Sequence, residues 1–320
     1  MGVFGPVAGD LAIVEAALRS EIEQDPSVVA EPMLDLFVAG GKRLRPALVL
    51  LAAGCGRYDL DRLIPAAMAV EMTHAATLVH DDVIDRSATR RGRPTVAAVL
   101  GDEPAIVIGD HYFAKAYELA ARTRSTEVVR ILARAVMDIC AGEVRQQAIR
   151  FLYSTDEAEY FVRIEAKTAT LLTASCDIGA LLGELEPGPR EAVRGYGHML
   201  GLAFQIADDV LDYTESEHDI GKPIGHDIAD GFATLPLMLA IKEGQSAKGL
   251  AKILRDGRKL STEEARQVVE LVRASNAPKA AIAIAQEYSS VARRRIESLP
   301  PGAARDALAS LTDYVVSRKL

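Results

Sequence analysis

Two acidic motifs with the same spacing, Asp-Asp-x-x-Asp, are the residues of this sequence best suited to chemistry. Each motif follows an apolar stretch with helical periodicity, and a helix places positions i and i+4 on one face with position i+1 beside them. Three adjacent carboxylates repel one another unless a hard cation binds them, and Mg²⁺ takes oxygen ligands that it shares with substrate phosphates. The alternative to a metal-binding motif is a solvated acidic helix end. The second copy of the motif argues against this alternative. The motifs consist of Asp81, Asp82 and Asp85, and of Asp208, Asp209 and Asp212.

Basic residues recur at four places around these motifs. Two glycines precede the first pair, and glycine lets the backbone and the cations approach a phosphate closely. Two arginines follow the first acidic motif, and the guanidinium fork suits phosphate oxygens. One lysine interrupts an apolar helical stretch, where a charge needs an anion or a cavity, and another follows the second motif. These residues are Lys42, Arg45, Arg90, Arg91, Lys167 and Lys222. Together they indicate a substrate with more than one phosphate.

The composition excludes several classes of protein. The 320 residues are 49% hydrophobic but only 5% aromatic, and they include no Trp, which favours helices over a β-sandwich or barrel. The net charge of −8 argues against nucleic acid as a partner. No apolar stretch approaches the roughly 20 residues of a membrane helix. The three cysteines, Cys55, Cys140 and Cys176, are widely spaced, which predicts neither a disulfide framework nor a zinc site and fits a reducing cytoplasm.

Helices are the elements that must position the motifs. Apolar residues recur at helical spacing in ten stretches separated by turn residues, and no segment alternates as a strand would. We therefore predict an all-α protein with a single domain over residues 1–320. The expected helices cover 11–22, 45–53, 63–79, 114–121, 128–149, 158–182, 191–211, 235–241, 267–272 and 280–296.

The order and spacing of these motifs resemble those of the trans-type isoprenyl (polyprenyl) diphosphate synthases. The matching stretches are GGKRLRP at 40–46, EMTHAATLVHDDVID at 71–85, the arginines at 90 and 91, KTAT at 167–170, and FQIADDVLD at 204–212 followed by GKPIG at 221–225. The resemblance covers residues 40 to 239. It implies the isoprenoid synthase fold, a large helical bundle around a central cavity, and an enzyme that condenses isopentenyl diphosphate with an allylic diphosphate.

The resemblance also implies roles for single residues. The six aspartates would hold Mg²⁺ on the allylic diphosphate, with Asp81, Asp85 and Asp208 as direct ligands. The isopentenyl diphosphate would be bound by Lys42, Arg45, His74 and Arg91, and the allylic diphosphate by Arg90, Lys167 and Lys222. Thr168 and Gln205 would lie beside the reacting carbons. The reaction needs no side-chain nucleophile, because the allylic diphosphate leaves and the isopentenyl double bond attacks the resulting cation.

One position departs from the family pattern. Residues 231–236 resemble the family's GKxTLP, but Phe232 replaces the lysine. One diphosphate contact is therefore missing, and we expect weaker allylic binding or slower ionisation. His226 lies nearby in the sequence, and we expect this basic residue to compensate in part for the missing lysine.

Two small residues below the first acidic motif bear on product length. Ala76 and Thr77 offer a growing chain no aromatic floor, so the resemblance favours a product of geranylgeranyl length or longer. Phe113 or Tyr117 would shorten the product if either side chain closed the tunnel.

Other functions remain as alternatives. A class I terpene cyclase or a head-to-head prenyl synthase is also helical and Mg²⁺-dependent, but a cyclase has no use for a second basic group. A subunit of a heteromeric prenyl synthase is a further alternative, although a regulatory subunit would have lost acidic motifs. A di-iron bundle would need Glu-x-x-His pairs, which the sequence lacks. The resemblance implies a homodimer.

Overall fold

The computed structural model describes residues 4–38, 40–41, 43–153, 155–214, 225–255 and 257–317, with 244–246 described for their backbone alone. Within these ranges the chain is helical apart from one antiparallel hairpin, so the predicted all-α class is confirmed. The chain forms two compact units, and each unit collects several separate stretches of sequence. The prediction of one domain over residues 1–320 stays a prediction.

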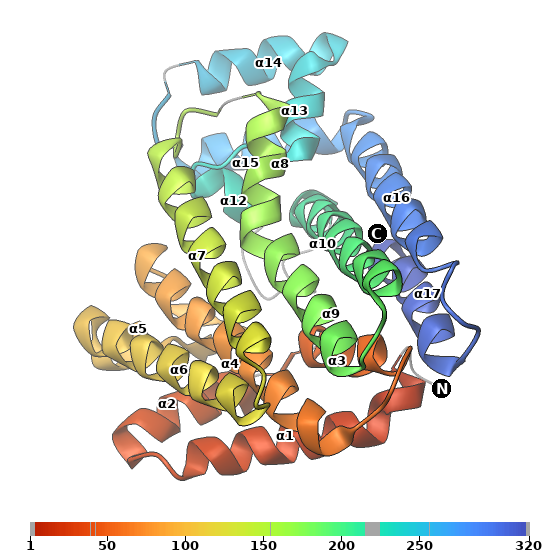
Figure 1. The fold of residues 1–320 in the computed structure, drawn as a ribbon. Coiled ribbons are helices and arrows are strands. Elements are labelled where there is room, and N and C mark those ends of the chain that lie inside the picture. The colour runs from red at the N-terminus through yellow and green to blue at the C-terminus, as the bar shows by residue number, and fades with distance from the viewer. Residues whose placement is uncertain are drawn as a thin grey trace. The chain divides into compact units, whose positions relative to one another are not determined.

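The first unit comprises Met1–Met137, Leu171–Gly197 and Arg295–Ser310. Its elements begin with η1 (Gly5–Val7), α1 (Ala8–Glu23), α2 (Ser27–Val38), α3 (Leu44–Ala53) and α4 (Leu60–Ile84). The hairpin of β1 (Thr89–Arg90) and β2 (Arg93–Pro94), α5 (Val96–Leu100) and α6 (Asp102–Arg122) follow. Helices α1, α2, α3, α5 and α6 all pack against α4 (Figure 1).

Helix α4 is buried because its sequence is apolar on every side. Residues 66–70 are all at most 4% exposed, and a helix without a polar face is stable only inside a core. Near Asp81 and Asp85, at the C-terminal end of α4, the burial becomes partial. The amide N–H of Asp85 still donates to the carbonyl of Asp81, at 2.8 Å, so these two carboxylates are one helical turn apart.

The second unit comprises Asp138–Thr170, His198–Arg294 and Leu311–Leu320. Several helices supply residues to both units, among them α7 (Thr126–Ala148), α10 (Pro187–Thr214) and α17 (Ala303–Val316). The others here are α8 (Glu157–Ile164), η2 (Glu165–Ala169), α12 (His226–Ala229), α13 (Leu235–Lys242), α14 (Gly244–Leu254), α15 (Thr262–Arg273) and α16 (Ala277–Arg295), while α9 (Thr170–Leu182) begins in this unit and continues in the first. Helix α13 packs against α8, α14 and α15 (Figure 1).

The predicted helical stretches all lie within observed helices to within one residue. The stretch 158–182 needs a correction, because it is not one α-helix: a π-helical segment, η2, separates α8 from α9. Helices α2, α5, α12, α14 and α17 were not predicted; α5 and α12 have only 5 and 4 residues, and α2 contains Pro32. Among the described helices, none combines the length and apolar character that a membrane crossing requires.

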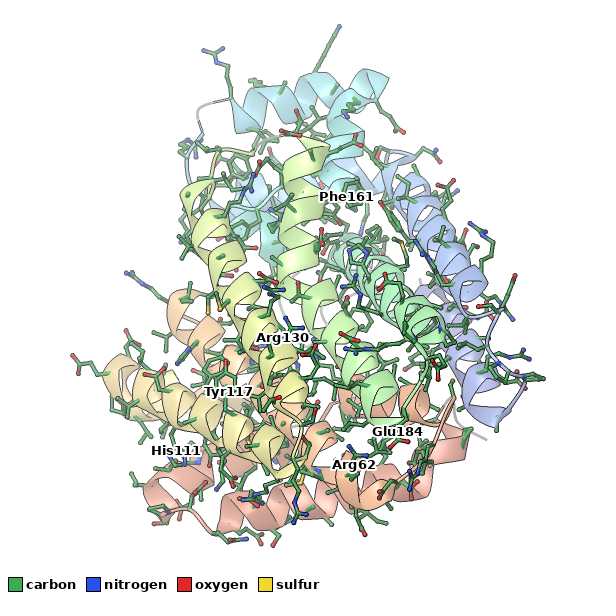
Figure 2. All side chains as sticks on the ribbon, in the orientation of Figure 1. Arg62, His111, Tyr117, Arg130, Phe161 and Glu184 are labelled. Carbon is green, nitrogen blue, oxygen red and sulfur yellow. The ribbon has the colours of Figure 1, made fainter. Side chains whose placement is uncertain are left out.

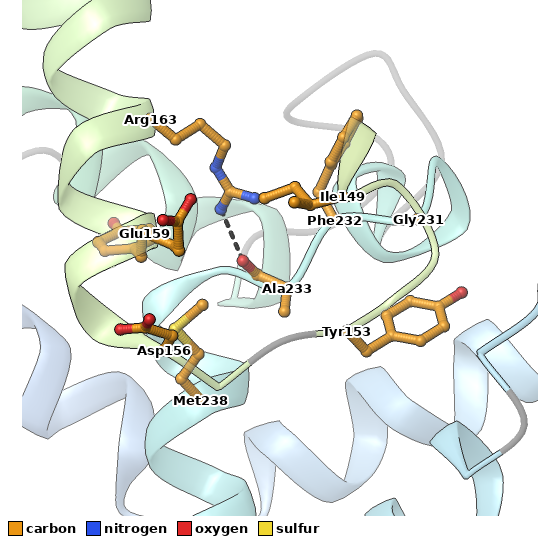
Figure 3. A pocket seen from close by; sticks show the side chains of 10 residues that line it. Ile149, Tyr153, Asp156, Glu159, Arg163, Gly231, Phe232, Ala233 and Met238 are labelled. Carbon is orange, nitrogen blue, oxygen red and sulfur yellow. Dashed lines mark hydrogen bonds between the residues drawn. The ribbon is translucent and has the colours of Figure 1, made fainter. Parts of the chain in front are cut away.

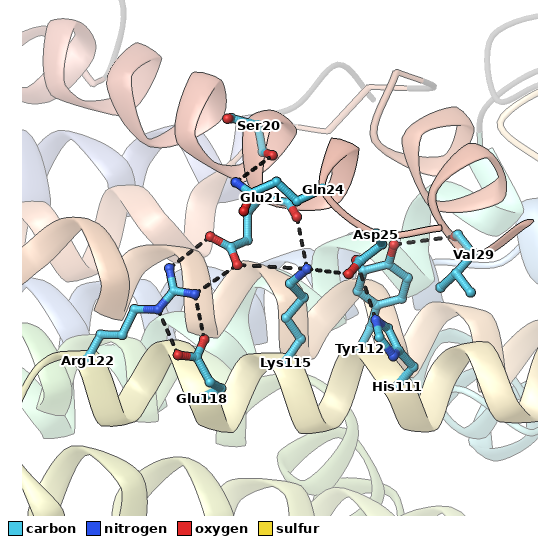
Figure 4. A network of polar contacts seen from close by, with 10 residues as sticks. All are labelled: Ser20, Glu21, Gln24, Asp25, Val29, His111, Tyr112, Lys115, Glu118 and Arg122. Carbon is cyan, nitrogen blue, oxygen red and sulfur yellow. Dashed lines mark hydrogen bonds and ion pairs between the residues drawn. The ribbon is translucent and has the colours of Figure 1, made fainter. Parts of the chain in front are cut away.

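A polar network ties α1 to α6 in the first unit (Figure 4). The Glu21 carboxylate accepts two hydrogen bonds from the Arg122 guanidinium, at 2.8 and 2.9 Å. The Lys115 ammonium donates to the Glu21 carbonyl at 2.9 Å and to Asp25 at 2.7 Å. Hydrogen bonding to Arg122 lowers the pKa of Glu21, so the folded state favours the ionised carboxylate. Glu21 is only 9% exposed, and its partners are needed to hold that charge at the helix contact.

We expect Glu21→Gln to lower the free energy of unfolding at pH 7 by about 1–2 kcal/mol, a value reduced because Arg122 is 45% exposed. Because the folded pKa lies below the unfolded value of about 4.3, the contribution is complete above that pH and disappears as pH falls through the folded pKa. Urea unfolding of both proteins at pH 7 and pH 3 should show a smaller difference at pH 3. Glu118→Gln, which changes the exposed partner of Arg122, is the control and should have less effect at pH 7. An equal difference at both pH values would contradict the assignment.

Candidate active site

The first acidic motif has one buried and two accessible carboxylates. Asp82 is 3% exposed, and its two oxygens accept hydrogen bonds from Nε of Arg90 at 2.9 and 3.0 Å. The hairpin of β1 and β2 places Arg90 on Asp82, because its strands turn the chain back directly after α4. Asp81 and Asp85 are half-buried. The structure thus engages Arg90, predicted to contact the allylic diphosphate, with the middle aspartate of the motif.

A cluster of cations lies in the same unit. Burial first, and then the charge of Arg91, lower the pKa of Arg45 to about 10, against the opposing effect of Glu71. The Nε atom of Arg45 is buried and has no hydrogen-bond partner among the described residues. A buried donor without an acceptor costs about 1–3 kcal/mol, and more when it is charged. The cluster therefore has an unmet requirement for an anion.

His74 belongs to this cluster. Burial lowers its pKa well below the usual value, and four arginines lower it further: Arg45, Arg91, Arg90 and Arg43. The imidazole is therefore neutral at pH 7 and offers a hydrogen bond rather than a charge. The structure brings together three of the four residues predicted for isopentenyl diphosphate, while the fourth, Lys42, lies outside the described residues.

Arg43 is a residue that the sequence analysis missed. Its guanidinium donates to Glu15 of α1 at 2.8 Å, to Glu71 of α4 at 3.0 Å and to the Phe37 carbonyl of α2 at 3.1 Å. Its backbone is left-handed, with φ at 47°, which is costly for a residue other than glycine and is maintained here by those contacts. Glu71, an isolated carboxylate in the apolar part of α4, was the available signal that a cation had to pack there.

The second acidic motif repeats this arrangement in the second unit with different partners. Asp209 is 3% exposed, and its oxygens accept from the Tyr160 hydroxyl and from Nε2 of Gln205, both at 2.7 Å. Asp208 is exposed. Asp212 accepts the backbone N–H groups of the first two residues of α12, each at 3.1 Å. The middle aspartate is again the structural member of its motif.

Two carboxylates of this motif, Asp209 and Asp212, have raised pKa values. Burial and the charge of Asp227 raise the pKa of Asp209 to about 7, although Gln205, Arg163 and Tyr160 oppose the shift. Burial and Asp227 also raise the pKa of Asp212 to about 8. Oxygen donors that resist ionisation because of neighbouring carboxylates fit a hard divalent cation such as Mg²⁺. In the described ranges no three acidic, histidine or cysteine side chains are close enough to bind a metal by themselves.

The predicted pair of Thr168 and Gln205 is in direct contact. The Thr168 hydroxyl donates to Oε1 of Gln205 at 2.5 Å, and the same amide donates to Asp209. Thr168 and Lys167 lie in the π-helical segment η2, a conformation frequent at functional sites. Gly201 lets α10 approach this segment, because a Cβ atom there would be 2.5 Å from the Cα atom of Ala169.

An open cavity lies beside Gln205 of this pair in the second unit. Its lining includes Lys167, Gln205, Asp209, Asp227 and Arg163, and we call it the Lys167 cavity. Tyr160, Arg163 and Asp227 are absent from the sequence-based site, since only their packing shows the relation to the acidic motif. Lys222 lies outside the described residues.

The residues predicted to set product length lie on α4. Ala76 is fully buried, and the Thr77 hydroxyl donates to the His74 carbonyl at 2.7 Å. Helix α4 packs along α6, which carries Phe113 and Tyr117. The His80 ring is 5.5 Å from the ring of Phe113, so this aromatic residue contacts α4 close to the first acidic motif.

Comparison with known proteins identifies the family. Residues 26–272 match the model of the polyprenyl synthetase family. The chain belongs to this family. It is 34% identical over 310 residues to heptaprenyl diphosphate synthase component 2 of Bacillus subtilis, covering 97% of this chain and 88% of that protein.

Solved structures of family members have the same fold. The heptaprenyl diphosphate synthase of Staphylococcus aureus matches with a TM-score of 0.92 and 32% identity over 98% of both chains. A polyprenyl synthase of Caulobacter crescentus, in complex with calcium and isoprenyl diphosphate, matches with a TM-score of 0.92 and 36% identity over 99% of this chain and 97% of that chain. The chain is a polyprenyl diphosphate synthase with the isoprenoid synthase fold, as the motifs predicted, and enzymes of this family use a divalent metal.

We expect Arg45→Gln to weaken the binding of inorganic diphosphate at least about tenfold, because a hydrogen bond to a charged group contributes about 1.5–3 kcal/mol. Titration calorimetry without divalent metal measures this directly. The matched control is Arg62→Gln, which removes an arginine paired with Glu184 at 3.4 Å on the surface (Figure 2) and should leave the affinity unchanged. Equal affinities for Arg45→Gln and the unmodified protein would disprove an anion site at Arg45.

Proposed function

We propose that the enzyme condenses isopentenyl diphosphate with an allylic diphosphate, head to tail, in a Mg²⁺-dependent reaction. The observation that carries the proposal is the buried, unpartnered Nε of Arg45 next to a neutral histidine and further arginines. This cluster is an anion site distinct in chemistry from the carboxylate motifs, which bind anions only through a metal. Two kinds of diphosphate site fit two diphosphate substrates, whereas a terpene cyclase needs only one.

The residues divide into three groups in this proposal. Asp81, Asp85 and Asp208 bind Mg²⁺ on the allylic diphosphate, while the remaining aspartates of the motifs fix the helix ends. Lys42, Arg45, His74 and Arg91 bind isopentenyl diphosphate, and Arg90, Lys167 and Lys222 bind the allylic diphosphate. When bound, Mg²⁺ neutralises charge that develops on the departing diphosphate.

Side chains of the protein stabilise the leaving group and orient the reacting carbons. Lysine and arginine side chains stabilise the leaving diphosphate electrostatically as the allylic carbon–oxygen bond breaks. The isopentenyl double bond then forms the new carbon–carbon bond, and the proton lost from isopentenyl is accepted by the released diphosphate. Thr168 and Gln205 present polar atoms beside the reacting carbons, and the hydrogen bond from Gln205 to Asp209 fixes the amide in that orientation.

A direct assay tests this function. Purified protein incubated with Mg²⁺, labelled isopentenyl diphosphate and dimethylallyl, geranyl or farnesyl diphosphate should form elongated products, detected by chromatography after dephosphorylation. We expect Asp208→Asn to reduce kcat about 10²-fold, because it removes an electrostatic contribution to the leaving-group step. Asp61→Asn, an exposed aspartate at the start of α4, should be within about twofold of the unmodified enzyme, as expected for a surface substitution. Failure to elongate any primer would refute the function of the isolated chain.

The product is geranylgeranyl diphosphate or longer in this proposal. Small side chains at Ala76 and Thr77 support it, as do the two similar proteins named as heptaprenyl diphosphate synthases.

Ala76→Phe should shorten the longest abundant product, because in this proposal the phenyl ring would fill space that a growing chain uses. The control is Ala12→Phe on the exposed side of α1, which should leave the product distribution unchanged. Chromatographic chain lengths decide the outcome, and an unaltered distribution for Ala76→Phe would contradict the tunnel assignment.

A homodimer is our proposal for the assembly. Exposed apolar side chains at Val99 and Val107, 63% and 66% accessible, support a contact with a second copy. A second candidate is a heteromeric enzyme, because the Bacillus subtilis relative is named as component 2 of its synthase.

We also propose a cytoplasmic location from the wide spacing of the cysteines.

A further inference from the structure

The substitution at Phe232 places an aromatic ring where the family pattern has a cation. Phe232 is 8% exposed, and its backbone N–H donates to the Asp227 carbonyl at 2.8 Å, which fixes the residue beside α12. A buried phenyl ring cannot bind a diphosphate. Its faces, however, attract cations, and two arginines have their guanidinium carbons within 6 Å of the ring centre.

The basic residues near Phe232 differ in how their charge is used. Arg150 donates to the Asp230 carbonyl at 2.6 Å, and its Nη2 atom is 3.8 Å from the Asp230 carboxylate. His226, the residue expected to compensate for the missing lysine, has its Nδ1 atom 3.0 Å from the same carboxylate. Asp230 therefore lies at ion-pair distance from both of these groups.

Arg163 of α8 is the remaining cation, and it is held differently. Its guanidinium carbon lies 5.7 Å from the Phe232 ring centre and 5.4 Å from that of Tyr160, and Nη2 donates to the Ala233 carbonyl at 2.6 Å (Figure 3). Within the described residues it has no carboxylate partner at ion-pair distance. Its Nε and Nη1 groups have no hydrogen-bond acceptor there either. Two rings and one carbonyl thus orient a guanidinium whose other donors remain available.

The position of Arg163 connects it to the predicted allylic site. It lines the Lys167 cavity together with Lys167 itself, which lies four residues further along the chain in the π-helical segment η2. The lining of this cavity also includes Asp209 of the second acidic motif. A guanidinium in this position can form a forked pair of hydrogen bonds to a phosphate.

We infer that Arg163, oriented by the Phe232 ring, binds the allylic diphosphate and supplies the contact that the missing lysine would have made. This inference rests on the proposed function. It explains why an aromatic residue is compatible with the position: a lysine at 232 would add a third positive charge beside Arg163 and Arg150, whereas a phenyl ring attracts both.

The test measures the KM for each of the two substrates separately. With isopentenyl diphosphate saturating, Arg163→Gln should raise the KM for farnesyl diphosphate at least about tenfold, as loss of a charge-assisted hydrogen bond predicts. The KM for isopentenyl diphosphate should change less than about twofold, because its site is assigned to other residues. Adding Phe232→Lys to Arg163→Gln should restore the farnesyl diphosphate KM to within about threefold, since the cation returns without a competing guanidinium at 163.

Arg150→Gln is the matched control, since Arg150 lies 5.6 Å from the same ring but does not line the Lys167 cavity. It should change the KM for farnesyl diphosphate less than about twofold. An unchanged KM in Arg163→Gln, or an equal increase in Arg150→Gln, would overturn the inference.

A binding measurement separates this inference from the proposed reaction. Calorimetry with farnesyl diphosphate and Mg²⁺ should give at least tenfold weaker binding to Arg163→Gln than to the unmodified protein, whether or not product forms. Elongation by the unmodified protein without this difference in affinity refutes the role of Arg163 alone. No binding to the unmodified protein refutes both proposals. Thermal unfolding of each variant verifies the fold. If Arg163→Gln unfolds, Arg163→Lys, which keeps the charge but not the forked pair of donors, takes its place in the affinity measurement.

Discussion

In both acidic motifs the middle aspartate is buried and accepts hydrogen bonds on both oxygens. In each unit, the elements around the motif must supply these hydrogen-bond partners. An ionised carboxylate inside a protein costs several kcal/mol unless it is paired and hydrogen-bonded. Asp82 therefore requires Arg90 from the hairpin that follows α4. Asp209 requires Tyr160 from α8 and Gln205 from its own helix. Of the outer aspartates, Asp208 is exposed and Asp81, Asp85 and Asp212 are half-buried.

The distribution of charge shows how one chain handles two anionic substrates. The protein is acidic overall, with a net charge of −8, yet the charges of four arginines act on His74 in the first unit. Local arrangement rather than net charge determines what each site attracts. Burial first, and then its positive neighbours, lower the pKa of the histidine, so the cluster combines fixed charges with a neutral donor. A protonated imidazole would add a further like charge, which is unfavourable in a buried position.

Much of the fold could be predicted from the sequence because local periodicity determines helices such as α4 and α10. The acidic motifs could be placed at helix ends for the same reason. The partners of the buried aspartates could not, since Tyr160 is 49 residues from Asp209, and nothing local links them. The contact between Arg43 and Glu71 likewise joins residues 28 positions apart. Phe232 was recognised as a departure from the family pattern, but only the packing reveals the arginines that its ring attracts.

The π-helical segment between α8 and α9 has a consequence for the helix that contains it. The backbone N–H of Thr170 donates to the Glu165 carbonyl, five residues earlier, so this turn contains one residue more than an α-helical turn. Each residue of an α-helix advances the side chains by about 100°, so the extra residue changes the phase of α9 relative to α8. Tyr160 and Ile164 define the buried face before the segment, and Leu171 and Ser175 belong to the buried face after it. Deleting a single residue between 165 and 169 would return the turn to α-helical geometry and rotate one of these faces away from its neighbours. The helical stretch formed by α8, η2 and α9 thus has two registers, and Lys167 and Thr168 lie in the turn where the register changes.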